Sequence, residues 1–118
     1  MSFYENEPKK NLLNELFEVL EHSNYNWKHV AWIGTNYGKV FDLNEFCRKA
    51  RKTNYYNGFG AQEIRNDLVI VLCDGNWIER REYDGSEWFQ LVKRPVPIVH
   101  VKPTKEFTLM EEDSWEED

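Results

Sequence analysis

Two glutamates and two arginines lie close together in the run Asn76–Tyr83, which alternates in the way a β-strand does. The alternation places Glu79 and Arg81 on one face and Arg80 and Glu82 on the other. A carboxylate beside a guanidinium could act as a general acid or base next to a bound anion. However, no histidine or nucleophile is placed nearby, and ion pairs on a solvated sheet face are the common reason for such a pattern. We therefore predict no catalytic residue, and an enzyme that uses Glu79 or Glu82 ranks third among the functions considered.

Metal-binding and redox chemistry have little support in the sequence. His22 and His29 have no nearby acid or cysteine to complete a ligand set and are expected on the surface. Cys47 and Cys73 lack a metal-type spacing, and two thiols are too few for a disulfide framework. No run of residues is apolar enough for a signal peptide or a membrane span. We expect a cytoplasmic protein of the bacterial host cell with reduced thiols, no metal and no cofactor.

The elements that position these residues centre on the stretch from Asp67 to Val92. Leu68–Leu72 is apolar on both faces, which indicates a central strand that is covered on both sides. Asp-Gly pairs at 74–75 and 84–85 are tight-turn signals, and each is followed by a further strand-like run. Two such turns in sequence predict an antiparallel β-meander.

Two helices and a small hairpin are predicted before the meander. Over residues 8–21 the apolar residues recur at helical spacing, and Glu15 and two further glutamates fall on the other side. Asp42 and Glu45 form the N-cap and N3 pattern of a capping box, which marks the start of the second helix. Between the helices, strands at residues 25–33 and 39–41 would form a hairpin. After the meander, residues 97–101 could add an edge strand.

The loop that follows the second helix has the composition of a binding loop. Tyr55, Tyr56 and Phe59 stand among asparagines and glycines, where they are either exposed for contact or close over the core. Four basic residues end the preceding helix: Arg48, Lys49, Arg51 and Lys52. They can stabilise the negative end of the helix dipole, bind nucleic acid together with the aromatic residues, or receive the acidic C-terminal tail. Dipole compensation is the favoured interpretation.

The acidity of the chain is confined to its C-terminal end. Residues 106–118 carry seven acids and no base, so their removal would change the formal charge from −6 to +1. Acidic segments with spaced aromatic residues often order only on a basic partner, and a run of carboxylates can imitate phosphates. The tail, defined as residues 105–118, is therefore either a binding segment or a solubilising one. Residues 1–104 are predicted to form a single domain.

The central stretch also resembles a known group of proteins. The run DLVIV at residues 67–71, Trp77, the pair Glu79-Arg80 and the run EYDGSEW at residues 82–88 are similar to small proteins encoded by phages and prophages of Gram-positive bacteria, as are residues 60–64. The likeness covers residues 57–95. Asn76 and Ala61 depart from the pattern, and the acidic tail is not part of it. The resemblance implies a phage early or accessory gene, and so favours anti-defence or host-takeover proteins.

We predict an α+β domain in which a three- to four-stranded antiparallel β-meander packs with two helices and carries a small N-terminal hairpin. The favoured function is that of a non-catalytic phage-type protein that binds and inhibits a bacterial nucleic-acid-handling or defence protein, such as a CRISPR effector. The partner is expected to present a basic surface, without direct nucleic-acid or membrane binding. The predicted contact residues are aromatic and acidic: Tyr55, Tyr56, Phe59, Trp77, Tyr83, Trp88, Phe107, Glu111, Glu112, Asp113, Trp115, Glu116 and Glu117. The alternative is a small-ligand or nucleotide-binding protein that uses the loop at residues 55–59 with Arg80 and Arg81.

Overall fold

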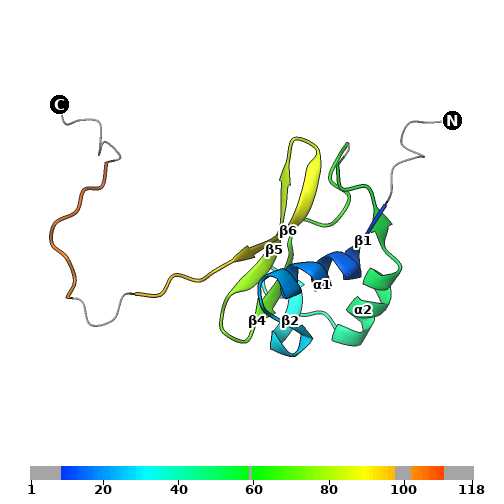
Figure 1. Cartoon of the computed structure of the whole chain (residues 1–118), viewed down its shortest axis with the longest axis horizontal. Coiled ribbons are helices and arrows are strands. Elements are labelled where there is room, and N and C mark those ends of the chain that lie inside the picture. The colour runs from blue at the N-terminus through cyan, green and yellow to red at the C-terminus, as the bar shows by residue number, and fades with distance from the viewer. Residues whose placement is uncertain (1–8, 59, 98–101, 111–118) are drawn as a thin grey trace.

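The computed structural model describes residues 9–58, 60–97 and 102–110, and it has an α+β fold with two antiparallel sheets (Figure 1). The predicted fold class is therefore confirmed. A 3₁₀ turn at Trp27–His29 precedes the strand β2. The helices and strands, in chain order, are β1 (Lys10–Asn11), α1 (Leu12–His22), β2 (Val30–Thr35), α2 (Leu43–Arg51), β3 (Asn54–Tyr55), β4 (Leu68–Leu72), β5 (Trp77–Tyr83) and β6 (Ser86–Val92).

Four strands form the main sheet in the order β2-β4-β5-β6, and every neighbouring pair is antiparallel. β4, β5 and β6 are the predicted meander, and the apolar strand β4 is internal to the sheet as expected. The expected cover on both of its faces was wrong for the described residues, because both helices pack on the same face. Asp84 and Gly85 have φ angles of 52° and 88°, the positive values that a two-residue hairpin turn requires. β1 and β3 make a separate two-stranded sheet that the sequence pattern did not predict.

The predicted N-terminal hairpin is present in a reduced form. Its strand begins at Val30 rather than at Tyr25, because Trp27–His29 form a 3₁₀ turn. The returning segment makes one bridge, between Gly34 and Val40, with two flanking backbone hydrogen bonds. The other edge of β2 pairs with β4, so the hairpin is part of the main sheet rather than a separate unit.

α1 begins at Leu12, where the Asn11 side chain accepts a hydrogen bond from the Asn14 amide at 3.0 Å. The start predicted at Pro8 lies outside the described residues. The apolar stripe of this helix faces the core, as its spacing predicted. One expectation was wrong: Glu15 is only 4% exposed, although it was assigned to the solvated side of the helix.

α2 begins at the predicted cap, where the Asp42 carboxylate accepts a hydrogen bond from the Glu45 amide at 2.8 Å. The side chain of Glu45 pairs with Arg48, so it does not complete the capping box that the sequence suggested. The helix buries Phe46 and Ala50 against the core, while its four basic residues are exposed. Their place in the last turn and at the C-cap fits the dipole interpretation.

The core lies between the helices and one face of the main sheet (Figure 1). Its centre is fully buried, since six aliphatic side chains from α1, β2, β4 and β5 are each 0% or 1% exposed: Leu16, Leu20, Ile33, Ile70, Leu72 and Ile78. Phe46 and Ala50 close the same core from α2. Both helices therefore pack on the face that these isoleucines share, which we call the inner face.

The chain leaves the sheet through a tethered segment after β6. The Arg94 amide donates to the Asn76 side chain at 2.9 Å, and its guanidinium donates to the Asp74 carbonyl at 2.7 Å. The edge strand predicted at residues 97–101 falls almost entirely outside the described residues. Residues 102–110, which include the first part of the tail, are all exposed (Figure 1). Among the described helices, none has the length and apolarity needed to cross a membrane.

Candidate partner-binding surface

The face of the main sheet opposite the core, here called the outer face, carries most of the tryptophans that the structure describes. Because side chains alternate along a strand, the residues between the core-facing positions must point to this side. None of them belongs to the hydrophobic core, although Val69 is itself buried. They come from all four strands: Trp32, Val69, Val71, Trp77, Glu79, Arg81, Tyr83, Trp88, Gln90 and Val92.

An apolar row crosses all four strands on the outer face. The strand register places Trp32 opposite Val71, Val71 opposite Trp77, and Trp77 opposite Val92. All four side chains are partly buried, and none of them belongs to the hydrophobic core or packs against it. Tryptophan rings held in a row of this kind offer a large apolar contact area at low entropic cost.

A polar network next to this row holds the indole rings in place. The Glu79 carboxylate accepts hydrogen bonds from the Trp77 indole N–H at 2.9 Å and from the Arg81 Nε at 2.6 Å. The Trp88 indole N–H donates to the Gln90 side chain at 3.2 Å. The polar groups of Trp77 and Trp88 on the outer face are therefore paired with neighbouring side chains on their own strands.

Glu79 does not have the properties of a general acid. Partial burial raises its pKa, but the hydrogen bonds from Trp77 and Arg81 outweigh burial and leave the pKa below its usual value. A catalytic carboxylic acid needs its pKa raised toward the working pH. The enzyme hypothesis based on this glutamate gains no support from its surroundings.

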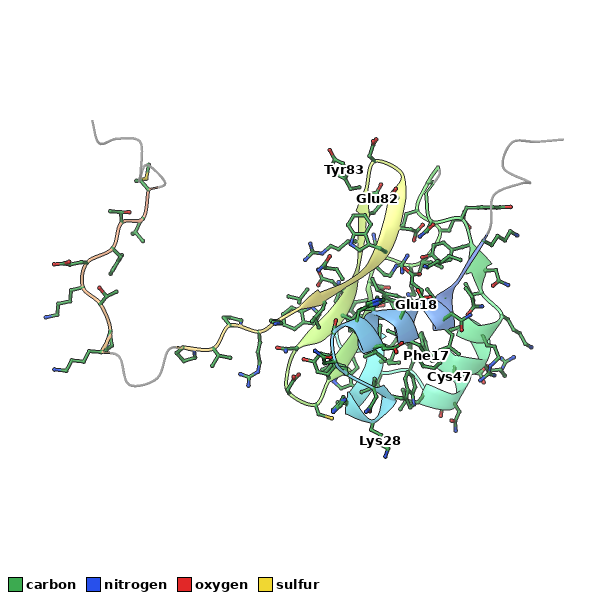
Figure 2. The ribbon with its side chains drawn as sticks, in the orientation of Figure 1. Phe17, Glu18, Lys28, Cys47, Glu82 and Tyr83 are labelled. Carbon is green, nitrogen blue, oxygen red and sulfur yellow. The ribbon has the colours of Figure 1, made fainter. Side chains whose placement is uncertain are left out.

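The end of the β5–β6 hairpin extends the outer face to an exposed tyrosine. Tyr83 is 75% exposed and stands beside the turn at Asp84 and Gly85 (Figure 2). Glu82 lies on the opposite side of the strand and accepts a hydrogen bond from the Gly85 amide at 3.3 Å. Tyr83, Trp77 and Trp88 were all predicted contact residues, and the fold brings these three onto one face.

The inner face contains a buried charge cluster that the sequence did not reveal. Arg80 was expected on a solvated sheet face, but its side chain is 0% exposed. It shares the inner face with Ile78, and its Nη2 donates to the Glu87 carboxylate at 2.9 Å. Its Nη1 lies 3.4 Å from a carboxylate oxygen of Glu15. The prediction of a solvated Arg80 was therefore wrong, because the two acids that neutralise it come from α1 and β6.

Backbone and aromatic groups complete the cluster. Glu87 also accepts hydrogen bonds from the amides of Glu63 and Ile64, at 2.7 and 3.2 Å, which ties the loop before β4 to β6. The Arg80 guanidinium lies over the Phe89 ring, 4.5 Å from its centroid. Within the described residues, its Nε is the one buried side-chain nitrogen or oxygen without a hydrogen-bond partner. The cluster joins α1, β3, β5, β6 and this loop.

Tyr55 was predicted to contact a partner, and this prediction was wrong. Its side chain is 2% exposed, and its hydroxyl donates to Glu15 and accepts from Arg80 at 2.9 Å. Burial and the hydrogen bond to Glu15 raise the pKa of Tyr55 well above its ordinary value. Tyr55 and Arg80 belong to the alternative prediction of a nucleotide site, and both side chains are buried in this structure.

The remaining residues of the predicted binding loop and tail are only partly described. Tyr56 is partly buried, with the Lys9 ammonium 5.3 Å from its ring centroid, and Phe59 lies outside the described residues. In the tail, Phe107 is 67% exposed, and Leu109 and Met110 are 90% and 77% exposed. The other predicted tail contacts lie outside the described residues: Glu111, Glu112, Asp113, Trp115, Glu116 and Glu117.

No group of three or more potential metal ligands occurs in the part of the chain that the structure describes. The Nδ1 of His22 contacts the Glu18 carbonyl at 2.9 Å, and the Nδ1 of His29 accepts from the Asn26 amide at the same distance. Cys47 and Cys73 are both free thiols. The two histidines thus have local structural partners.

Among the aromatic residues of the outer face, Trp32 is the one that sequence reasoning missed. Trp32 was assigned to a strand but not to a contact surface, because its partner strand was unknown. Its alternation with the buried Ile33 is a signal that could have placed it opposite the core. Arg81 was assigned to the correct face, as part of a surface ion pair and of the alternative nucleotide site, but not as a protein contact.

No protein-family model, no curated protein and no solved structure matches the chain. The features of the chain that bear on its function are therefore the outer face and the acidic tail.

Proposed function

We propose that this is a non-catalytic binding protein, and that its outer face contacts a protein partner. The observation that supports this proposal is the row of tryptophans on a sheet face that no described helix covers. Trp, Tyr and Arg are the residues most enriched among binding hot spots, and Trp77, Arg81 and Tyr83 stand together here. A face of this composition fits a protein interface.

The shape of the outer face favours a protein over a small molecule. Small ligands occupy concave sites that enclose most of their surface. The two pockets that the structure describes are lined by residues of α1, α2 and neighbouring segments, and neither includes a residue of the outer face. A broad sheet surface with paired polar groups instead matches the apolar centre and polar surroundings of a protein–protein contact.

The acidic tail gives the partner its expected charge. With seven acids in residues 106–118 and a formal charge of +1 for the rest of the chain, the attraction is concentrated in one segment. A basic partner would be steered toward it, and this steering weakens as salt rises. The exposed side chains of Phe107, Leu109 and Met110 would add apolar contacts next to the acids.

The narrower proposal is that the partner is a bacterial nucleic-acid-handling or defence protein, and that the chain inhibits it in the manner of phage anti-defence proteins. Two observations support it. A run of carboxylates can occupy a site built for phosphates, and the stretch at residues 57–95 resembles phage and prophage proteins.

A pull-down with a surface variant tests the contact. The tagged protein and its double variant Trp77→Thr/Trp88→Thr are incubated with a lysate of a Gram-positive host, and retained proteins are identified by mass spectrometry. Threonine keeps the strand propensity while it removes the indole rings. The proposal expects a protein that the wild type retains and the double variant loses, with affinity lowered about 30-fold or more.

A matched control separates the outer face from exposed aromatic residues in general. Tyr37 is 70% exposed but lies in the hairpin turn after β2, so Tyr37→Ser should retain the same partner. Circular dichroism checks that all three proteins are folded. If the wild type and the double variant retain the same proteins equally well, the outer face is not the contact surface.

The role of the tail is tested separately. Deletion of residues 106–118 should weaken binding of the purified partner and reduce its dependence on salt concentration. Unchanged affinity and unchanged salt dependence would show that the tail is only solubilising. That result would leave the contact through the outer face intact.

A further inference from the structure

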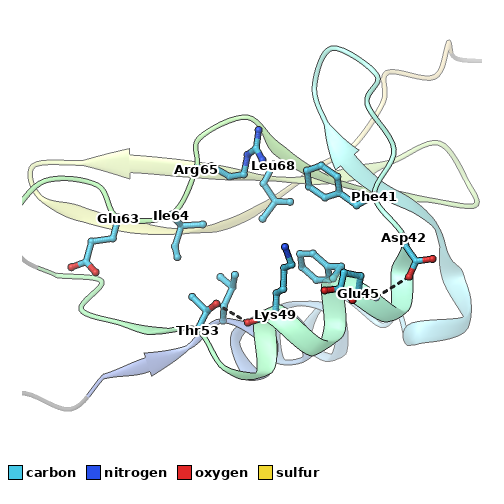
Figure 3. A pocket seen from close by; sticks show the side chains of 12 residues that line it. Phe41, Asp42, Glu45, Lys49, Thr53, Glu63, Ile64, Arg65 and Leu68 are labelled. Atoms are coloured by element: carbon cyan, nitrogen blue, oxygen red, sulfur yellow. Dashed lines mark hydrogen bonds between the residues drawn. The ribbon is translucent and has the colours of Figure 1, made fainter.

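A pocket lies on the core side of the molecule, between α2 and the loop before β4 (Figure 3). It has a volume of about 450 Å³, which falls within the range of small-ligand sites. The segment at residues 63–65 forms one wall and α2 forms the other. The floor is apolar and consists of core side chains that reach the surface here: Leu12, Phe46, Ala50, Ile64 and Leu68.

Most of the charged groups at the mouth of this pocket are already paired. The Asp42 carboxylate caps α2 through the Glu45 amide at 2.8 Å. The Glu45 side chain binds Arg48, which lowers the pKa of Glu45. Arg65 pairs with Asp67, which does not line the pocket, at 2.6 Å. Each of these charged groups therefore already has a partner within the protein.

Lys49 is different from the other cations at the mouth. No carboxylate in the described residues lies within ion-pair distance of its ammonium group. Figure 3 shows the Lys49 side chain rising from α2 toward Leu68, across the apolar floor, whereas the carboxylate of Glu63 points away from the pocket. The Thr53 hydroxyl, which also lines the pocket, donates its hydrogen bond to the Lys49 carbonyl at 2.8 Å.

From this arrangement we propose that the pocket binds a small amphipathic carboxylate, that is, an aliphatic or aromatic acid. Its apolar body would lie against Phe46 and Ile64, and its carboxylate would pair with Lys49. The apolar floor supplies the hydrophobic contribution, and an ammonium group beside an apolar wall forms a stronger charge-assisted bond than one in water. This site is separate from the outer face, so the inference goes beyond the proposed partner binding and does not depend on it.

Octanoate and octanol are suitable probes because they share the same apolar chain and differ in charge. The full-length nitrogen-15-labelled protein is titrated with each, and amide shifts are followed by NMR. Octanoate is expected to shift the amides of Ala50, Thr53, Ile64 and Leu68. Octanol should shift the same amides at higher concentration, because it cannot pair with Lys49.

Two variants on the same helix end test the role of the charge. Lys49→Met keeps an unbranched apolar side chain and removes the ammonium, and it should lower the octanoate affinity about tenfold while the octanol affinity is unchanged. Lys52→Met is the matched control, since Lys52 is the exposed C-cap of α2 and does not line the pocket. It should leave both affinities unchanged.

Three results would overturn the inference. The first is the absence of shifts at the pocket amides up to the solubility limit of octanoate. The second is an equal loss of octanoate affinity in both lysine variants, which would indicate a diffuse charge effect. The third is octanoate binding that requires deletion of residues 106–118, which would mean that the tail is the natural occupant. None of these results bears on the partner assays, in which Lys49→Met should behave as the wild type.

Discussion

The two faces of the main sheet are built from the same strands, yet they use similar residues in opposite ways. On the inner face, Arg80 is completely enclosed and is neutralised by Glu15 and Glu87. On the outer face, its neighbour Arg81 is exposed and pairs with Glu79. One step along a strand thus separates a structural charge from one that is available for contact. The position of a residue in the alternation, rather than its type, decides which role it has.

The largest test of this contrast compares the two arginines. Arg80→Met leaves two buried acids without their cation, and we expect the free energy of unfolding to fall by about 3–5 kcal/mol. Arg81→Met removes a partly exposed ion pair and should cost less than about 1 kcal/mol. Urea unfolding followed by tryptophan fluorescence measures both. Equal losses in the two variants would mean that the faces do not differ as described.

The neighbouring aromatic residues on β6 give the next test. Phe89 is 4% exposed and packs in the core, so Phe89→Ala should lower the free energy of unfolding by about 3–5 kcal/mol. Trp88 is only partly buried on the outer face, so Trp88→Ala should cost about 1 kcal/mol. The same unfolding measurement applies. A larger loss for Trp88→Ala would indicate that the outer face is a second core.

A smaller effect on stability is expected from the two consecutive tyrosines, Tyr55 and Tyr56. Tyr55→Phe removes a hydroxyl that bonds with both Glu15 and Arg80, and should cost about 1–3 kcal/mol. Tyr56→Phe alters a partly buried residue outside the charge cluster and should change stability by less than about 0.5 kcal/mol. Differential unfolding in urea distinguishes the two. If Tyr55→Phe were neutral, the hydroxyl would not be needed to satisfy the cluster.

The smallest effect concerns a carboxylate outside both faces. The hydrogen bond from the Tyr25 hydroxyl, at 2.7 Å, lowers the pKa of Asp74 in the folded protein. Its stabilising contribution is therefore complete above the unfolded pKa and is lost as the pH falls through the folded pKa. The stability difference between wild type and Tyr25→Phe should begin to shrink below about pH 5 and should keep shrinking below the ordinary aspartate pKa of about 3.9. A difference that grows on acidification would contradict this assignment.

Local signals in the sequence predicted the meander and the start of α2 correctly. The Asp-Gly turns and the cap at Asp42 act through nearby backbone groups, so a short window of sequence contains the necessary information. The charge cluster is different, because Glu15 and Arg80 are 65 positions apart and meet only after the sheet forms. The alternation placed Arg80 with Ile78, but no local pattern showed that this face would be buried. The outer face could be recognised only in part for the same reason.

The buried pair of Arg80 and Glu87 has a consequence for how the hairpin of β5 and β6 assembles. A slip of one residue would turn Glu87 to the outer face and leave the Arg80 charge enclosed without it. The same slip would turn Phe89 and Leu91 away from the core, so the apolar pattern and the buried charge specify the same register. Glu15 of α1 pairs with the same arginine. We therefore expect α1 to pack stably on the sheet only when β5 and β6 are aligned in this register.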